Sequence, residues 1–445
     1  MRFKRAASTP VIIHEDVRID GLSHDGRGIA RYHGKTLFID GALPGETVRV
    51  RILEDKRRFI NARVSEVLSA SPERREPACA HFRQCGGCSL QYWSHEGQLD
   101  SKQHIVLDQL RRFAQVVPEH IEESLVSPPY GYRHRCRFAI RWRKGRLSLG
   151  FREKGSNAIC DINECPILAE PLQEMPVLMK SFLPTLTGRE AISHVECFLA
   201  EQGRGLLLRH IRPLSQEDQT LLTAFASAHQ LLLYLQGSPE SIRLLYPARS
   251  DDDAAVALHY SLPESGVQLY FRPQDFTQVN RVINQAMVGQ AIQWLGPQAS
   301  DKVLDLFCGL GNFSLPLAKK SGHVTGVEGS PGSVAQATRN AGLNGLNNVS
   351  FHCADLSSDF TTEPWAKEHY DIVVLDPPRA GADFMIEQLA CLLPDRLLYI
   401  SCNPATLARD AGSLVSHGFR LERLCVMDMF PQTSHVESMA LFVRS

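Results

Sequence analysis

The chain has 445 residues, of which 43% are hydrophobic and 22% charged, so its composition excludes disordered and fibrous classes and its length predicts two or three domains. No apolar run approaches the roughly 18 residues that a membrane span needs, and acidic residues interrupt the N-terminus too early for a signal peptide, so we expect a cytoplasmic protein without a membrane partner. The net charge is −1, but the charges are unevenly distributed along the chain. Residues 1–155 hold 28 Lys and Arg against 18 Asp and Glu, and this excess of positive charge would attract a polyphosphate partner.

Short alternating strands broken by Gly and Pro turns are predicted from about residue 15 to residue 70. In the segment ETVRVRI, Val48 and Val50 share one face of a strand, while Arg49 and Arg51 share the other. The pattern indicates a small β-barrel with arginines outside. These arginines either form a solvated sheet face or contact a nucleic acid.

Three of the twelve cysteines fall within ten residues, at Cys79, Cys85 and Cys88. In a chain without an export signal, thiols or metal ligands explain cysteines better than disulfides do. The glycines at positions 86 and 87 let the loop fold around an inorganic core, and the three thiolates need a fourth, for which Cys160 and Cys165 are available. The spacing alone leaves a zinc site and an iron–sulfur cluster both open.

A helical segment is predicted from about 94 to 117, where Leu99, Val106, Leu110 and Phe113 fall on one stripe. Residues 125–265 are predicted to be mainly strands. Within them an extended chain would line one face with guanidinium groups, which suits contact with phosphates. These arginines, at odd positions of YRHRCRFAIRWRKGR, are Arg133, Arg135, Arg137, Arg141 and Arg143.

After about residue 266 apolar strands alternate with helices, which predicts a doubly wound α/β domain with a largely parallel sheet. In such a sheet, ligands bind beyond the carboxyl ends of the strands. We therefore expect three domains, at residues 1–72, 73–265 and 266–445, with the helix at about 94–117 packed on the last of them.

The segment DLFCGLGNF ends the first of these strands with two glycines, which let the backbone turn tightly and approach a ligand. Ser314 stands where the dinucleotide fingerprint requires a third glycine, so a ligand without phosphates is favoured over a pyrophosphate cofactor. Glu328 closes the next strand, where its carboxylate could accept hydrogen bonds from two ribose hydroxyls, and Asp355 follows the third strand, in reach of an adenine. These positions suit a nucleoside-bearing methyl donor. Acidic or glycine-rich helix N-caps are the alternative explanation.

Two further strands end in reactive side chains, Asp376 in VVLDPPRAG and Cys402 in YISCNPATLARD. A cysteine at a strand end is often buried and inert, but the Asn403-Pro404 turn and the facing Asp376 favour a nucleophile. Glu437 directly precedes the last strand, either as a base or as half of a surface salt bridge.

The strings DLFCGLGNFSLPLA, LDPPRAG, SCNPATLARD and HVES together resemble the RNA uracil-5-methyltransferases, through the whole C-terminal domain. The resemblance implies an α/β Rossmann-like domain that uses S-adenosyl-L-methionine as methyl donor. It also implies that Cys402 is the nucleophile and that Glu437 is the base that abstracts a proton. The donor contacts that carry over are Gln278, Phe307, Asn312, Glu328, Asp355 and Asp376.

The front of the chain resembles the ribosomal RNA branch of this family. Residues from about 15 to 70 are similar to a TRAM domain, an RNA-binding OB-like β-barrel, and CAHFRQCGGC is similar to an iron–sulfur motif. The resemblance therefore implies a mainly β central domain with a 4Fe-4S cluster, which is structural or shapes the RNA because methyl transfer requires no electron. The implied ligands of the cluster are Cys79, Cys85, Cys88 and Cys165.

The resemblance also implies the substrate. We expect a monomeric enzyme that methylates one uridine of 23S ribosomal RNA, either protein-free or in an early assembly intermediate. Another ribosomal site or a tRNA is the alternative. Two other classes fit less well: a non-catalytic RNA-binding protein does not need Cys402 and Glu437, and DNA cytosine-5 methylation uses a Pro-Cys pair, whereas Ser401 precedes Cys402 here.

Overall fold

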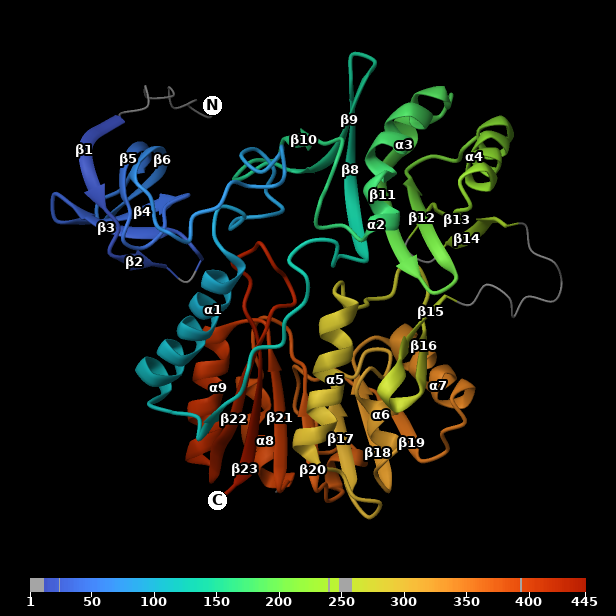
Figure 1. The fold of residues 1–445 in the computed structure, drawn as a ribbon. Helices are drawn as coiled ribbons and strands as arrows, with labels where there is room; N and C mark the ends of the chain where they lie inside the picture. The colour runs from blue at the N-terminus through green and yellow to red at the C-terminus, as the bar shows by residue number, and fades with distance from the viewer. Residues whose placement is uncertain (1–11, 24, 239–240, 248–257, 393) are drawn as a thin grey trace, which may run out of the picture. The chain divides into compact units, whose positions relative to one another are not determined.

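The computed structural model describes residues 12–23, 25–238, 241–247, 258–392 and 394–445 (Figure 1). The chain forms two compact units, one of residues 1–102 with 432–435 and the other of residues 103–431 with 436–445. Among the described residues, every helix is too short or too polar to cross a bilayer.

The first unit contains a six-stranded sheet in the order β1-β5-β6-β4-β3-β2. Val48 and Val50 of β5 are fully buried, whereas Arg49 pairs with Glu66 at 2.7 Å on the outer face, so the predicted alternation is confirmed. The six strands are β1 (Ile12–Arg18), β2 (Gly21–Leu22), β3 (Gly28–Tyr32), β4 (Lys35–Asp40), β5 (Thr47–Asp55) and β6 (Phe59–Ser69).

The predicted helix from 94 to 117 forms α1 (His95–Gln109), which continues as a π-helix over Leu110–Ala114. Val106 and Leu110 are fully buried in the core beside the large sheet of the second unit, as the stripe predicts. Phe113 is 71% exposed, so its prediction was wrong. The π-helix has more residues per turn than an α-helix, and a spacing of three from Leu110 therefore no longer returns to the buried face.

The second unit begins with a seven-stranded sheet in the order β10-β9-β8-β11-β12-β13-β14. Its strands are β8 (Arg135–Arg143), β9 (Arg146–Arg152), β10 (Ile159–Asp161), β11 (Ile192–Ala200), β12 (Gly203–His210), β13 (Leu232–Gln236) and β14 (Ile242–Tyr246). The described part of this region also holds the α-helices α2 (Glu170–Gln173), α3 (Met175–Phe182) and α4 (Gln216–Ala228). A hairpin of β15 (His259–Leu262) and β16 (Val267–Tyr270) follows.

The arginines predicted to share one face of residues 133–143 differ in exposure. The Arg135 guanidinium donates to Glu196 at 2.9 Å and to the Asp275 carbonyl at 2.6 Å, and Arg133 Nε donates to the Arg135 carbonyl at 2.9 Å. The prediction of a continuous guanidinium face was therefore wrong at its N-terminal end, because protein acceptors hold these two groups. The exposed arginines are Arg137, Arg141 and Arg143.

The C-terminal sheet has eight strands in the order β19-β18-β17-β20-β21-β23-β22-β7. The first five run parallel, β23 is antiparallel to both β21 and β22, and β7 is parallel to β22, which confirms the predicted largely parallel sheet. The strands are β7 (His120–Ile121), β17 (Lys302–Leu306), β18 (His323–Glu328), β19 (Val349–Cys353), β20 (Ile372–Leu375), β21 (Arg396–Ser401), β22 (Phe419–Met427) and β23 (Glu437–Arg444).

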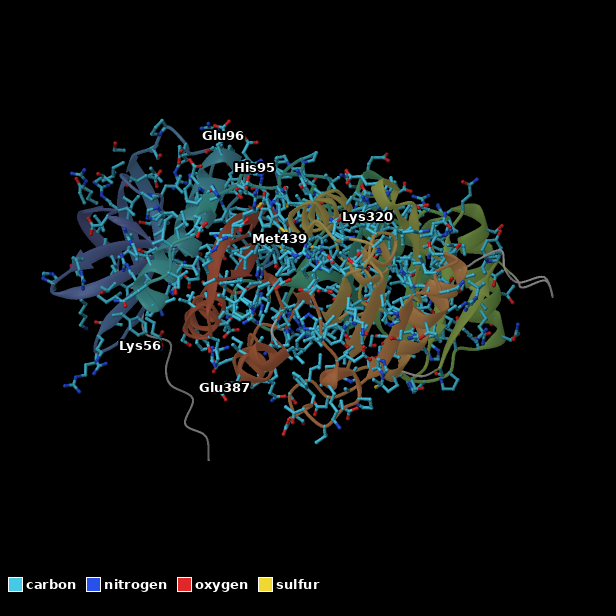
Figure 2. The ribbon with its side chains drawn as sticks, turned by 90° about the horizontal axis from the view of Figure 1, so that it is seen from below. Lys56, His95, Glu96, Lys320, Glu387 and Met439 are labelled. Atoms are coloured by element: carbon cyan, nitrogen blue, oxygen red, sulfur yellow. The ribbon has the colours of Figure 1, made fainter. Side chains whose placement is uncertain are left out.

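Helices cover both faces of this sheet, so its strands are apolar on both sides. Val303 packs with α5 residues on one face, while Leu304 packs with α8 and α9 residues on the other. Helix α5 lies in front of the sheet and α8 behind it in Figure 1. Figure 2 labels Met439, buried within β23, and Glu387, on the outward side of α8. The helices are α5 (Arg281–Leu295), α6 (Ser314–Ala318), α7 (Pro331–Leu343), α8 (Asp383–Leu392) and α9 (Pro404–Ser416).

Candidate active site

The carboxyl ends of β17, β18, β20 and β21 meet at one edge of the sheet, because these strands are parallel. The register of β21 and β23 brings two predicted residues together at this edge. Ser401 pairs with Ser438, so Cys402, which directly follows β21, and Glu437, the first residue of β23, are neighbours. The N-cap of α9, Asn403, follows at once, and its side chain accepts a hydrogen bond from Ala405 N at 3.2 Å.

The charged groups around Cys402 shift the pKa of its thiol in opposite directions. Burial raises the pKa of the half-buried Cys402 thiol, and the carboxylates of Glu437 and Asp376 raise it further. The guanidinium of Arg379 acts in the opposite direction and lowers the thiol pKa. At neutral pH the thiol is therefore mostly protonated, and a positive charge is already near the sulfur to favour the thiolate. Arg379 lies in the quoted LDPPRAG string, but its role was missed.

The loop after β17 holds a strained backbone. Phe307 has φ of 63°, a left-handed conformation that costs a residue with a side chain about 1–3 kcal/mol. Gly311 has φ of 90°, and a Cβ there would lie 3.0 Å from Leu315 Cγ. Phe307 packs against the core beside α8 and α9, which holds the loop in place. The loop thus keeps backbone atoms close to the carboxyl edge of the sheet.

Glu328, at the end of β18, holds the loop after β17 by a hydrogen bond. Its carboxylate accepts hydrogen bonds from Gly309 N at 3.2 Å and from Ser330 N at 2.9 Å. Each oxygen of a carboxylate can accept a second hydrogen bond. Glu328 can therefore hold the loop and still accept hydrogen bonds from a ligand.

Asp305 is a further acidic residue at this edge, and it was not among the residues predicted from the sequence. It is fully buried in β17, its Oδ2 accepts a hydrogen bond from the Ser314 hydroxyl, and its Oδ1 has no partner among the described residues. Burial, together with the carboxylates of Asp376 and Glu328, raises the pKa of Asp305 to about 7. An acidic residue within the apolar strand KVLDL was the signal for it.

Asp376 follows β20 directly, and its backbone N donates to the Leu306 carbonyl of the neighbouring strand at 3.4 Å. Burial raises the pKa of Asp376 to about 7. Near neutral pH its carboxyl group is therefore partly protonated, so it can donate a hydrogen bond as well as accept one.

Asn312 and Gln278 belong to a polar region between α5 and the hairpin β15–β16. Asn312 exchanges hydrogen bonds with Asn284 of α5 at 2.9 and 3.1 Å and accepts another from the Tyr260 hydroxyl at 3.0 Å. Gln278 lines a small pocket together with Asn284, Tyr260 and Arg281. Nothing in the sequence indicated Asn284 or Tyr260.

Asp355 differs from the other predicted residues because its carboxylate is turned onto its own loop. It is exposed, and it accepts hydrogen bonds from Ser357 N at 3.0 Å, from the Ser357 hydroxyl at 2.6 Å and from the Ser358 hydroxyl at 3.2 Å. These bonds lower the pKa of Asp355. The structure places it beyond the end of β19, on the loop that follows this strand.

The predicted cluster ligands lie on two loops. Cys79 and Cys88 pack against a small core with Leu90, and Gly87 N donates to Cys85 Sγ at 3.3 Å. Cys165 is 8% exposed and follows β10. Within the described ranges, no group of three or more His, Cys, Asp or Glu side chains is arranged to hold a metal ion.

Comparison with known proteins identifies the family. The model described as tRNA (Uracil-5-)-methyltransferase matches residues 94–445, and the TRAM domain model matches residues 14–65. Proteins named 23S rRNA (uracil(1939)-C(5))-methyltransferase RlmD from Pseudomonas fluorescens and Vibrio vulnificus are 46% and 44% identical to this chain, over 99% and 96% of it and 96% of each relative. The crystal structure of Pyrococcus abyssi tRNA (uracil-54, C5)-methyltransferase in complex with S-adenosyl-L-homocysteine has the same fold, with a TM-score of 0.72 at 23% identity, over 96% of this chain and 100% of that one. The chain therefore belongs to the tRNA (uracil-5-)-methyltransferase family and carries a TRAM domain in front of its methyltransferase fold.

Proposed function

We propose that this protein transfers a methyl group from S-adenosyl-L-methionine to C5 of uracil 1939 in 23S ribosomal RNA. The observation that carries the proposal is the pairing of Ser401 with Ser438, which makes Cys402 and Glu437 neighbours at the carboxyl edge of the sheet. A nucleophile and a base side by side are what C5 methylation of uracil requires. The relatives named for this reaction are 44–46% identical to the chain over nearly its whole length, which supports the choice of substrate.

The residues at the edge fit the methyl donor. S-adenosylmethionine carries a sulfonium and an ammonium group, and three carboxylates, those of Asp305, Glu328 and Asp376, are close enough for their charges to interact. The buried Asp305 Oδ1 lacks a partner in the described protein, and a cationic ligand would satisfy it. We propose that Gln278, Phe307, Asn312, Glu328, Asp355 and Asp376 hold the donor.

The donor supplies an electrophilic methyl group, and the chain supplies the remaining chemistry. Cys402 loses its proton to water with the help of the Arg379 charge, and its sulfur forms a bond to C6 of the uracil, which places an electron pair on C5. That pair forms the new C–C bond as the S–CH3 bond of the sulfonium breaks. Glu437 then removes the C5 proton, the C5–C6 double bond re-forms, and the Cys402 thiolate leaves. Asp376, partly protonated near neutral pH, positions the uracil or the donor by hydrogen bonds.

The target base must leave its stack to reach Cys402, and unstacking costs a few kcal/mol. Contacts between the RNA and the N-terminal part of the chain have to offset this cost. The exposed guanidinium groups of Arg137, Arg141 and Arg143 and the basic excess of residues 1–155 suit phosphate contacts. We propose that the protein acts as a cytoplasmic monomer on protein-free RNA or on an early assembly intermediate.

The substrate is tested with purified protein, labelled S-adenosylmethionine and two RNAs, a protein-free 23S fragment that contains uracil 1939 and an unmodified tRNA. We expect label only in the 23S fragment, at C5 of uracil 1939. A fragment in which cytosine replaces this uracil is the matched control, and it should remain unlabelled. Labelled tRNA with an unlabelled 23S fragment would overturn the substrate while leaving the uracil-5 chemistry intact.

We also propose that Cys79, Cys85, Cys88 and Cys165 ligate a 4Fe-4S cluster with a structural or RNA-shaping role. The hydrogen bond from Gly87 N to Cys85 Sγ supports this, because backbone N–H groups directed at thiolate sulfurs are a usual feature of such clusters.

Protein purified without oxygen should be brown and contain about four iron atoms per chain. Cys165→Ser should lower the iron content by more than about half, because three thiolates hold the cluster less well than four. Cys160→Ser, which changes a fully buried neighbouring cysteine, is the matched control and should leave the iron content unchanged. One zinc per chain without iron would contradict the cluster, and loss of iron only in Cys160→Ser would reassign the fourth ligand.

A further inference from the structure

The loop of residues 376–382 joins β20 to α8 and carries both Asp376 and Arg379. Hydrogen bonds connect this loop to the first turns of α9. The side chains involved are that of the N-cap, Asn403, and those of Thr406, Arg409 and Asp410 in α9. Their spacing of three or four residues puts them on one face of the helix. All four belong to the string CNPATLARD, in which only Cys402 has a role in the proposed chemistry.

Two α9 side chains and the N-cap hold backbone carbonyls of the loop. Asn403 Nδ2 donates to the Arg379 carbonyl at 3.1 Å, and the Thr406 hydroxyl donates to the same oxygen at 3.5 Å. Arg409 Nη2 donates to the next carbonyl, that of Ala380, at 2.9 Å. The loop is therefore held at the residue whose guanidinium acts on Cys402.

Asp410 connects this loop to the strand that ends at the nucleophile. It is fully buried, and its Oδ2 accepts hydrogen bonds from Ala382 N and from the Tyr399 hydroxyl, both at 2.6 Å. Its Oδ1 accepts a hydrogen bond from Arg409 Nε at 2.8 Å. Tyr399 lies on β21, three residues before Cys402. One carboxylate thus joins the loop, helix α9 and the strand that leads to the sulfur.

The loop of residues 376–382 packs closely against α9. A Cβ built at Gly381 would lie 2.6 Å from both Arg409 Nη2 and Asp410 Oδ2 and 3.0 Å from Thr406 Cβ. Because the helix face approaches so closely, the loop can shift only if the Arg409 and Asp410 contacts are broken.

We propose that Arg409 and Asp410 are positioning residues that hold the loop of residues 376–382 so that Arg379 stays beside Cys402. The proposal rests on the proposed function in one respect, that Cys402 is the nucleophile. Without these two side chains, the carbonyl of Ala380 and the N–H of Ala382, on the C-terminal side of Arg379, lose their partners, and the loop moves. The guanidinium then leaves the sulfur, while the carboxylate of Glu437, on a separate strand, stays and continues to disfavour the thiolate.

The test follows alkylation of Cys402 by iodoacetamide in the full-length protein, without RNA, at several pH values, by mass spectrometry of the Cys402 peptide. Arg409→Met and Asp410→Asn should each lower the rate at pH 8 about three- to tenfold and shift the pH profile upward, as loss of a nearby opposite charge does. Arg379→Ala should give a similar loss. Because the three residues act through one charge, combining Arg379→Ala with Arg409→Met should give no further loss.

Asp218→Asn is the matched control, because Asp218 is also fully buried and also accepts backbone N–H groups, those of Thr187 and Gly188, at 2.8 Å each. It should lower the melting temperature and leave the Cys402 pH profile unchanged. The Arg409 side chain is 45% exposed, so Arg409→Met tests the proposal even if Asp410→Asn does not fold. A wild-type alkylation profile in Arg409→Met, or a combined loss equal to the product of the single losses, would overturn the proposal. Alkylation needs neither RNA nor donor, so failure of the methylation assay would be seen separately.

Discussion

Cys402→Ala is expected to lower the rate of methyl transfer at least about 10⁴-fold, which is the scale of losing a covalent nucleophile. Uracil C5 is too weak a nucleophile to attack the sulfonium methyl group by itself, and only addition of a thiolate at C6 makes it reactive. The measurement is a single-turnover assay with labelled donor and the 23S fragment. Binding of the RNA should remain within about twofold of the wild type, because alanine removes one half-buried sulfur and no charge.

Cys353→Ala is the matched control for this experiment. Cys353 ends β19, at the same edge of the same sheet, and is exposed, but three strands separate β19 from β21 in the sheet order. Its variant should methylate at the wild-type rate. If Cys402→Ala kept more than about one hundredth of the wild-type rate, covalent catalysis through this residue would be excluded.

The fold could be predicted where burial imposes a period on the sequence. Val48 and Val50 alternate with Arg49 because one face of β5 is buried, and the apolar run at Val303 and Leu304 reflects helices on both faces of the sheet. The π-helix at Leu110–Ala114 could not be predicted, because a change in turn geometry leaves the apolar spacing almost unchanged. The pairing of Arg135 with Glu196 was also hidden, since the two residues meet only through the register of β8 and β11.

In the candidate site, too, some residues could be predicted from the sequence pattern and others could not. Residues that directly follow strands, such as Asp376 and Cys402, could be predicted to share an edge, because parallel strands place their carboxyl ends together. That Glu437 lies beside Cys402 depends on the antiparallel register of β23, which no local pattern specifies. Asn284 contacts Asn312 only because α5 packs against the loop after β17. Tertiary contacts of this kind carry no periodic signal in the sequence.

Glu437→Gln is expected to slow turnover by roughly 10²–10⁴-fold, the usual contribution of a general base, and to leave a covalent protein–RNA adduct. Glutamine has nearly the same shape as glutamate but cannot accept the C5 proton, so elimination of the sulfur stops after methyl transfer. The change also removes a carboxylate that raises the pKa of the Cys402 thiol, so the thiolate fraction at neutral pH increases and the addition step is not weakened. A denaturing gel of labelled RNA should therefore show a slowly migrating species.

Two controls separate this mechanism from a general loss of structure. The double variant Cys402→Ala with Glu437→Gln should give no adduct, because the sulfur that forms the bond is absent. Glu422→Gln, in the surface pairs with Arg420 and Arg423 on β22, removes a carboxylate away from the edge and should turn over at the wild-type rate without an adduct. If Glu437→Gln gave no slowed species and kept its turnover, another group would have to take the C5 proton, and Asp376, whose pKa of about 7 suits a base near neutral pH, would be the residue to change next.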